Sequence, residues 1–123
     1  MQRLQSLVLS VVLGAATLAS PLAMAHATIQ LSEPAANAQL AKAPSAIALT
    51  FNEDVEPAFS SIVLQDSTGK AVPEVGKAAV DATNKRLLKL DLPALKSGGY
   101  IVRWVAVGPD GHRRNGQYNF SVK

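Results

Sequence analysis

The chain has two histidines, His26 and His112, and both lie where they could bind a metal ion. His26 follows Ala23-Met24-Ala25, whose small residues are typical of a signal-peptidase cleavage site. Cleavage after Ala25 would give His26 a free α-amine beside its imidazole, and these two nitrogens form a chelate. Asp110 and His112 are two residues apart, which places their side chains on one face of an extended segment. The glycine between them allows a turn instead.

Together these groups offer an amine nitrogen, two imidazole nitrogens and a carboxylate oxygen. A roughly planar set of three nitrogens and one oxygen is what Cu(II) prefers, whereas zinc would accept the same donors in tetrahedral form with lower affinity. The α-amine has an ordinary pKa of about 7.7 to 8.0, so a metal ion competes only weakly with its proton near neutral pH. The spacing therefore favours Cu(II), and the geometry is plausible because the first and last strands of a sandwich commonly approach each other.

Residues 1–25 have the features of an export signal. Arg3 supplies a positive start, residues 7–18 are mostly apolar, and Pro21 follows them. A membrane anchor is the alternative, but a spanning helix needs about 20 apolar residues, and this segment is interrupted by Ser6, Ser10, Gly14, Thr17 and Ser20. No Arg-Arg pair directs export of the folded protein. We therefore expect a cleaved signal peptide, residues 1–25, and one mature domain, residues 26–123, that acquires metal after export.

The composition excludes several kinds of protein. The mature chain would have 98 residues, enough for one small domain. Its net charge of about +2 is too weak and dispersed for a nucleic-acid surface. Cysteine is absent, which excludes disulfides and thiolate metal sites. Stability must therefore come from an apolar core.

Short alternating segments separated by turn residues predict an all-β fold. The expected strands are residues 28–31, 47–51, 61–65, 86–92, 100–107 and 117–122, with a weaker, irregular or edge segment at 72–80. No amphipathic helix is evident. The pattern predicts a seven-stranded, antiparallel Greek-key sandwich of the immunoglobulin-like kind.

The aromatic residues are expected to be structural. Tyr100 follows two glycines and precedes a long apolar strand, which is typical of a tyrosine corner, although an aromatic that simply begins a strand is the alternative. Trp104 lies in the middle of that strand and is expected to anchor the core. The same core role is predicted for Phe51, Phe59 and Phe120.

Over essentially its whole length, the mature chain resembles the bacterial periplasmic copper-resistance protein C (CopC) family. The matching motifs are His26-Ala27-Thr28-Ile29, Ser32-Glu33-Pro34-Ala35, Leu49-Thr50-Phe51-Asn52-Glu53, residues 95–104, Asp110-Gly111-His112 and residues 116–122.

The resemblance implies a cupredoxin-like or immunoglobulin-like barrel that holds one Cu(II) ion through the processed N-terminal histidine and a late Asp-x-His. His26, Asp110 and His112 are therefore the implied copper ligands. Glu53 matches a family glutamate near the Cu(II) site and is a weaker candidate, because a solvated carboxylate at a strand end is an equally good interpretation. The implied partner is an inner-membrane copper transporter.

One departure from the family pattern concerns sulfur. Some relatives hold Cu(I) in a methionine-rich loop, but Met1 and Met24 both lie in the segment to be removed. Residues 66–80, where those relatives carry methionines, contain none. Because soft sulfur ligands select Cu(I), we expect this protein to bind Cu(II) alone.

The residues leave three classes of function open. The first is a periplasmic protein, not an enzyme, that sequesters Cu(II) or delivers it to the transporter. The second is a copper enzyme, because oxidative polysaccharide monooxygenases use the same amine-plus-imidazole donors; Asp110 and the small surface count against it. The third is a metal-free module for adhesion or assembly, because this fold class has many functions.

Overall fold

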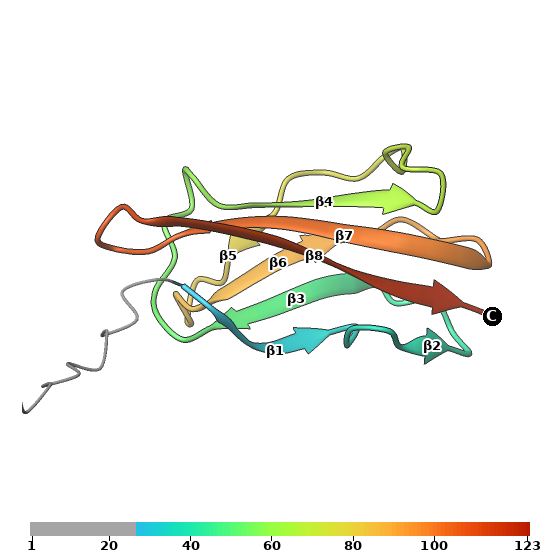
Figure 1. Ribbon diagram of the computed structural model, residues 1–123, viewed down its shortest axis with the longest axis horizontal. Helices are drawn as coiled ribbons and strands as arrows, with labels where there is room; N and C mark the ends of the chain where they lie inside the picture. Colours follow the sequence, from blue (N-terminus) through green and yellow to red (C-terminus); the bar gives the residue numbers. More distant parts are fainter. Residues whose placement is uncertain (1–26) are drawn as a thin grey trace, which may run out of the picture.

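The computed structural model describes residues 27–123, so the predicted signal peptide and His26 lie outside the described residues. Within that range the chain forms eight β-strands arranged in two sheets (Figure 1). The strands are β1 (Ile29–Glu33), β2 (Gln39–Leu40), β3 (Ala46–Phe51), β4 (Ser61–Asp66), β5 (Ala79–Val80), β6 (Leu87–Asp91), β7 (Gly98–Val107) and β8 (Arg113–Val122). Residues 27–123 contain no helix that could cross a membrane.

Each sheet has four strands, in the orders β1-β3-β6-β5 and β2-β8-β7-β4. Neighbouring strands are antiparallel except β2 and β8, which are parallel. Alternate residues of a strand point to opposite faces, so Ile47, Leu49 and Phe51 of β3 are fully buried while the residues between them are only partly covered. Together with Leu88, Leu90 and Val102 they form the centre of one core. The prediction of an all-β sandwich is confirmed.

The number and bounds of the strands differ from the prediction. The structure has eight strands in residues 27–123 instead of seven, because β2 is a two-residue strand that is too short to show an alternating pattern. β8 begins at Arg113 instead of residue 117, since its polar first half continues the ladder with β7. In the weakly patterned segment at 72–80, only Ala79–Val80 is a strand.

The tyrosine corner is present. The Tyr100 hydroxyl donates a hydrogen bond to the Lys96 carbonyl oxygen at 2.6 Å, and the Tyr100 ring stacks on Phe120. Trp104 is partly buried and packs edge-on against Phe51, with ring centroids 5.5 Å apart. These contacts support the structural roles predicted for the four aromatic residues.

The prediction that Phe59 lies in the core is wrong, because 67% of its surface is exposed. Phe59 belongs to a turn between β3 and β4, closed by a hydrogen bond from its amide to the Glu56 carbonyl. The next residue, Ser60, is buried instead, and its hydroxyl accepts a hydrogen bond from the Val107 amide at 3.1 Å. The turn is therefore tied to β7 while the phenyl ring faces solvent.

The sandwich has two distinct ends (Figure 1). One, which we call the hairpin end, carries the β7–β8 turn (residues 108–112), the β3–β4 loop (residues 52–60) and the start of the described chain. The other, the corner end, carries the loops at residues 67–78 and 92–97 and the C-terminus. Asp110, His112 and Glu53 all belong to the hairpin end.

Candidate metal centre

The turn that carries Asp110 and His112 is closed by its own backbone. The Gly108 amide donates to the His112 carbonyl at 3.2 Å, and the Gly111 amide donates to the Gly108 carbonyl at 3.0 Å. Gly111 has a φ of +81°, a left-handed conformation that glycine adopts without steric cost. The turn is therefore tight, and it joins two ten-residue strands that are paired along their whole length.

This turn brings Asp110 and His112 together. The Asp110 Oδ1 accepts the His112 backbone N–H at 3.1 Å, and Asp110 Oδ2 lies 2.7 Å from the His112 Nδ1. These bonds, the His112 side chain first, hold the pKa of the Asp110 carboxyl below its usual value. Both side chains are exposed to solvent, by 57% for His112 and 36% for Asp110. The structure brings these two residues together through a turn at Gly111, the second of the two arrangements that the sequence left open.

Glu53 lies beside the same turn. It follows β3, and its Oε1 is buried without a hydrogen-bond partner in the described part of the chain. A Cβ built on Gly108 would overlap this oxygen and would lie 3.3 Å from Asp110 Oδ1. Both carboxylates thus lie close to Gly108, and a side chain at this position would require the Glu53 carboxylate to shift. A buried, unpaired carboxylate oxygen is costly, so a cation or a donor beside it would be stabilising.

The start of the described chain is fixed next to Glu53. Ala27 is fully buried in the core. The Thr28 amide donates to Asn52 Oδ1 at 2.7 Å, and the Asn52 amide donates to the Thr28 carbonyl at 3.0 Å. Asn52 was not among the functional residues predicted from the sequence. Its signals were its place in the family motif at residues 49–53 and a side-chain amide directly after a strand.

The described residues do not complete a metal site by themselves. Among residues 27–123, no group of three or more histidine, cysteine, aspartate or glutamate side chains is arranged to hold an ion. The Asp110–His112 pair offers one oxygen and one imidazole, with Glu53 close by. His26, predicted to supply two more nitrogens, lies outside the described residues.

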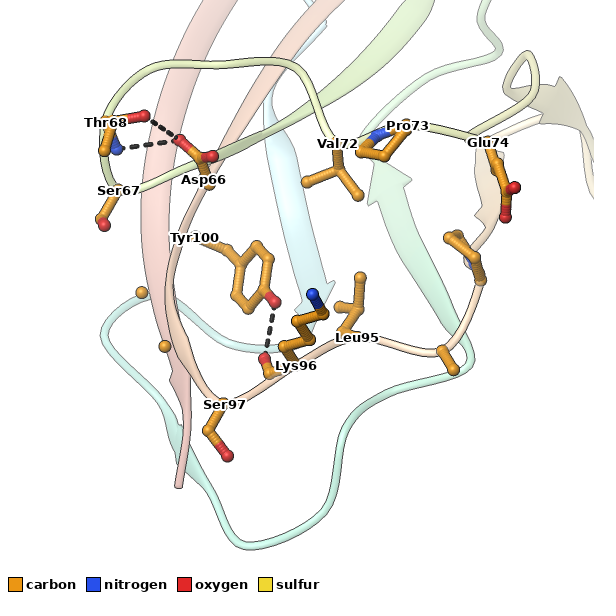
Figure 2. Close-up of a pocket in the computed structure, with 14 residues that line it drawn as sticks. Asp66, Ser67, Thr68, Val72, Pro73, Glu74, Leu95, Lys96, Ser97 and Tyr100 are labelled. Carbon is orange, nitrogen blue, oxygen red and sulfur yellow. Dashed lines mark hydrogen bonds between the residues drawn. The ribbon is translucent and has the colours of Figure 1, made fainter.

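The corner end contains a cavity instead of a histidine-bearing turn. A cavity of about 420 Å³ lies there between the loop after β4 and the segment before β7. Figure 2 shows the Tyr100 ring in this cavity, with its hydroxyl bonded to Lys96, and Asp66 bonded to Thr68 at the rim. Nitrogen and oxygen are the only heteroatoms among the lining residues, because none is methionine or cysteine. This end therefore offers no soft ligand for Cu(I).

Comparisons with known proteins identify similar chains and folds. The family model described as the CopC domain matches residues 29–123. Protein YobA of Escherichia coli strain K12 is 37% identical over 107 residues, which is 87% of this chain and 86% of that protein. Copper resistance protein C of Xanthomonas campestris pv. juglandis is 35% identical over 124 residues, covering 97% of each. The crystal structure of CopC from Methylosinus trichosporium OB3b matches with a TM-score of 0.75 and 40% identity, over 80% of this chain and 94% of that one.

Proposed function

Because the chain belongs to the CopC family, we propose that it is a periplasmic copper-resistance protein that binds one Cu(II) ion at the hairpin end. The ligands are the α-amine and imidazole of His26 after cleavage behind Ala25, together with Asp110 and His112. The observation that carries the proposal is the Asp110–His112 pair, held 2.7 Å apart at the end of the sandwich where the described chain begins.

The spacing of this pair suits two neighbouring ligands of one ion. Nitrogen and oxygen ligands bind metals such as zinc at about 2.0 to 2.2 Å, and two of them at a right angle are then about 2.8 to 3.1 Å apart. Asp110 Oδ2 and His112 Nδ1 therefore need to move little to share an ion. The depressed pKa of Asp110 keeps the carboxylate ionised in the acidic range just below its ordinary value, ready to bind a cation.

Glu53 is proposed to act beside the ion. Its buried oxygen lacks a partner among residues 27–123, and it lies close to Gly108, as Asp110 Oδ1 does. A Cu(II) ion or a His26 N–H donor would satisfy that oxygen. Groups that contact a ligand or its metal in this way commonly affect metal affinity by 10- to 100-fold.

Copper is the cargo of this protein in our proposal and not a catalyst. Asp110 would occupy a position that an oxidising enzyme keeps open for its substrate, so we propose sequestration of copper or its delivery to an inner-membrane transporter. The relative from Xanthomonas is named a copper resistance protein. The absence of methionine from residues 26–123 supports selectivity for Cu(II) over Cu(I).

The experiment compares the protein that begins at His26 with a variant carrying one alanine before His26. The extension turns the α-amine into an amide, so Cu(II) affinity measured against a competing chelator is expected to fall by roughly 100-fold, about 2.7 kcal/mol. Electron paramagnetic resonance should show a changed set of nitrogen ligands, because the new α-amine lies one residue further from the His26 imidazole.

The matched control adds one alanine after Lys123, at the corner end, and should leave affinity unchanged. Equal Cu(II) affinity in the two N-terminal forms would refute the chelate. Mass spectrometry of the exported protein tests the same point independently, because a chain that begins anywhere except at His26 contradicts the proposal.

A further inference from the structure

We propose that Asn52 is the positioning residue for the N-terminal copper chelate, fixing the first residues of the mature chain beside Glu53 and the β7–β8 turn. The inference rests on the proposed function, since it concerns how His26 is presented to the ion. It adds a residue that neither touches the metal nor belongs to the donor set.

Asn52 makes an unusual pair with Thr28. In a regular antiparallel ladder, two facing residues exchange backbone N–H to carbonyl bonds in both directions. Here the Asn52 amide donates to the Thr28 carbonyl at 3.0 Å, as in a ladder. The reciprocal bond, however, runs from the Thr28 amide to the side-chain oxygen Oδ1, at 2.7 Å. The carboxamide replaces a backbone carbonyl.

This replacement lets the chain leave the sheet without releasing the first strand. β3 ends at Phe51, and its last rung to β1 pairs Phe51 with Ile29. Directly after Asn52 the chain places Glu53 against Gly108 of the β7–β8 turn. An ordinary rung at Asn52 would need its backbone carbonyl to face Thr28. The side-chain bond removes that requirement. Asn52 can therefore hold the first strand while its backbone turns away from the sheet toward Glu53.

Thr28 lies two residues after His26, which carries the predicted chelate. Both its amide and its carbonyl are bonded to Asn52, and Ala27 is fully buried. His26 is joined to Ala27 by one peptide bond, and consecutive Cα atoms are 3.8 Å apart. We call the two hydrogen bonds between Thr28 and Asn52 the clamp. The clamp restricts the positions that the two nitrogens of His26 can reach.

Removing the clamp is expected to weaken copper binding through entropy. A first strand that is loose in the metal-free protein must be ordered when the ion binds, and ordering one residue's backbone costs about 1 to 2 kcal/mol. A preorganised chelate avoids that cost. Loss of the Asn52 side chain should therefore lower Cu(II) affinity even though no ligand is removed.

The experiment uses proteins that begin at His26: the parent, Asn52→Ala, Asn52→Asp and Tyr100→Phe. We expect Asn52→Ala to bind Cu(II) about tenfold more weakly than the parent, about 1.4 kcal/mol, and its Thr28 amide to exchange hydrogen faster in the metal-free state. Asn52→Asp keeps an oxygen acceptor and should restore affinity. Tyr100→Phe loses one hydrogen bond at the corner end, so it should lower thermal stability without changing affinity.

The proposal is overturned if Asn52→Ala binds Cu(II) as tightly as the parent. It is also overturned if Tyr100→Phe loses Cu(II) affinity in proportion to its loss of stability. If Asn52→Ala does not fold, hydrogen exchange in the parent decides: an unprotected Thr28 amide contradicts the clamp, and a protected one supports it. Nitrogen hyperfine structure in Asn52→Ala should show a mixture of coordination states, which a purely structural role would not produce. A parent that fails to bind Cu(II) refutes the proposed function, and that result is independent of every Asn52 variant.

Discussion

Two turns at opposite ends of the sandwich are built on the same local motif. At the corner end, Asp66 Oδ1 accepts hydrogen bonds from the Thr68 amide at 2.9 Å, the Thr68 hydroxyl at 2.6 Å and the Lys70 amide at 3.1 Å. At the hairpin end, Asp110 accepts the His112 amide and contacts its imidazole. In both turns the bond from the side chain two residues later is the main reason why the aspartate pKa is lowered.

The comparison shows that an Asp-x-His contact is not by itself a sign of metal binding. An aspartate commonly bonds to the residue two positions later, whether that residue is threonine or histidine. The hairpin end differs in what surrounds the turn. The Glu53 carboxylate lies against Gly108, and the first strand is tied to Asn52 nearby. A turn becomes a candidate metal site through these neighbours.

The largest effect is expected when the hairpin turn loses its imidazole. His112→Ala should weaken Cu(II) binding by roughly 100-fold, about 2.7 kcal/mol, and Asp110→Ala by less, because a carboxylate oxygen bonds Cu(II) less covalently than an imidazole nitrogen. Thr68→Ala, the equivalent change at the corner end, should have no effect on affinity. Competition titrations against one chelator compare all three, and the reverse order of His112→Ala and Asp110→Ala would contradict the assigned roles.

A smaller effect is expected from Gly108→Ala. The added Cβ would overlap Glu53 Oε1, so the carboxylate must move away from the turn while all four proposed ligands remain. Cu(II) affinity should fall by about tenfold, as for other residues that support a metal ligand. Gly76→Ala is the matched control, because a Cβ there has open space. If Gly108→Ala binds copper as the parent does, Glu53 has no part in the site.

The smallest effect is expected from copying the motif to the other end. Thr68→His gives Asp66 a histidine two residues later, but residues 27–123 place neither a second buried carboxylate nor the first strand beside that turn. The stoichiometry measured by titration should stay at one tightly bound Cu(II) per chain. A second ion of comparable affinity would show that the turn alone is sufficient.

Much of the fold was accessible from sequence because its signals are local. The alternation in residues 47–51 predicts β3, and the glycine pair before Tyr100 predicts the corner. Phe59 was placed wrongly because its exposure depends on Ser60, whose buried hydroxyl bonds a strand 47 residues away. No local pattern records that contact.

The candidate site was accessible in part for the same reason. Asp110 and His112 are close in sequence, so their pairing could be predicted. The approach of Glu53 to Gly108 and the bond from Thr28 to Asn52 link distant segments, and no local pattern distinguishes Asn52 from other polar residues at strand ends. Glu53 was identified only through the family resemblance.

The edge position of β1 affects how a bound ion could leave. β1 has one neighbour in its sheet, β3, whereas the turn with Asp110 and His112 closes a hairpin of ten paired residues on each strand. Fraying of an edge strand requires far less free energy than global unfolding. At the proposed site, dissociation of copper should therefore begin with detachment of the N-terminal strand, while the hairpin stays folded.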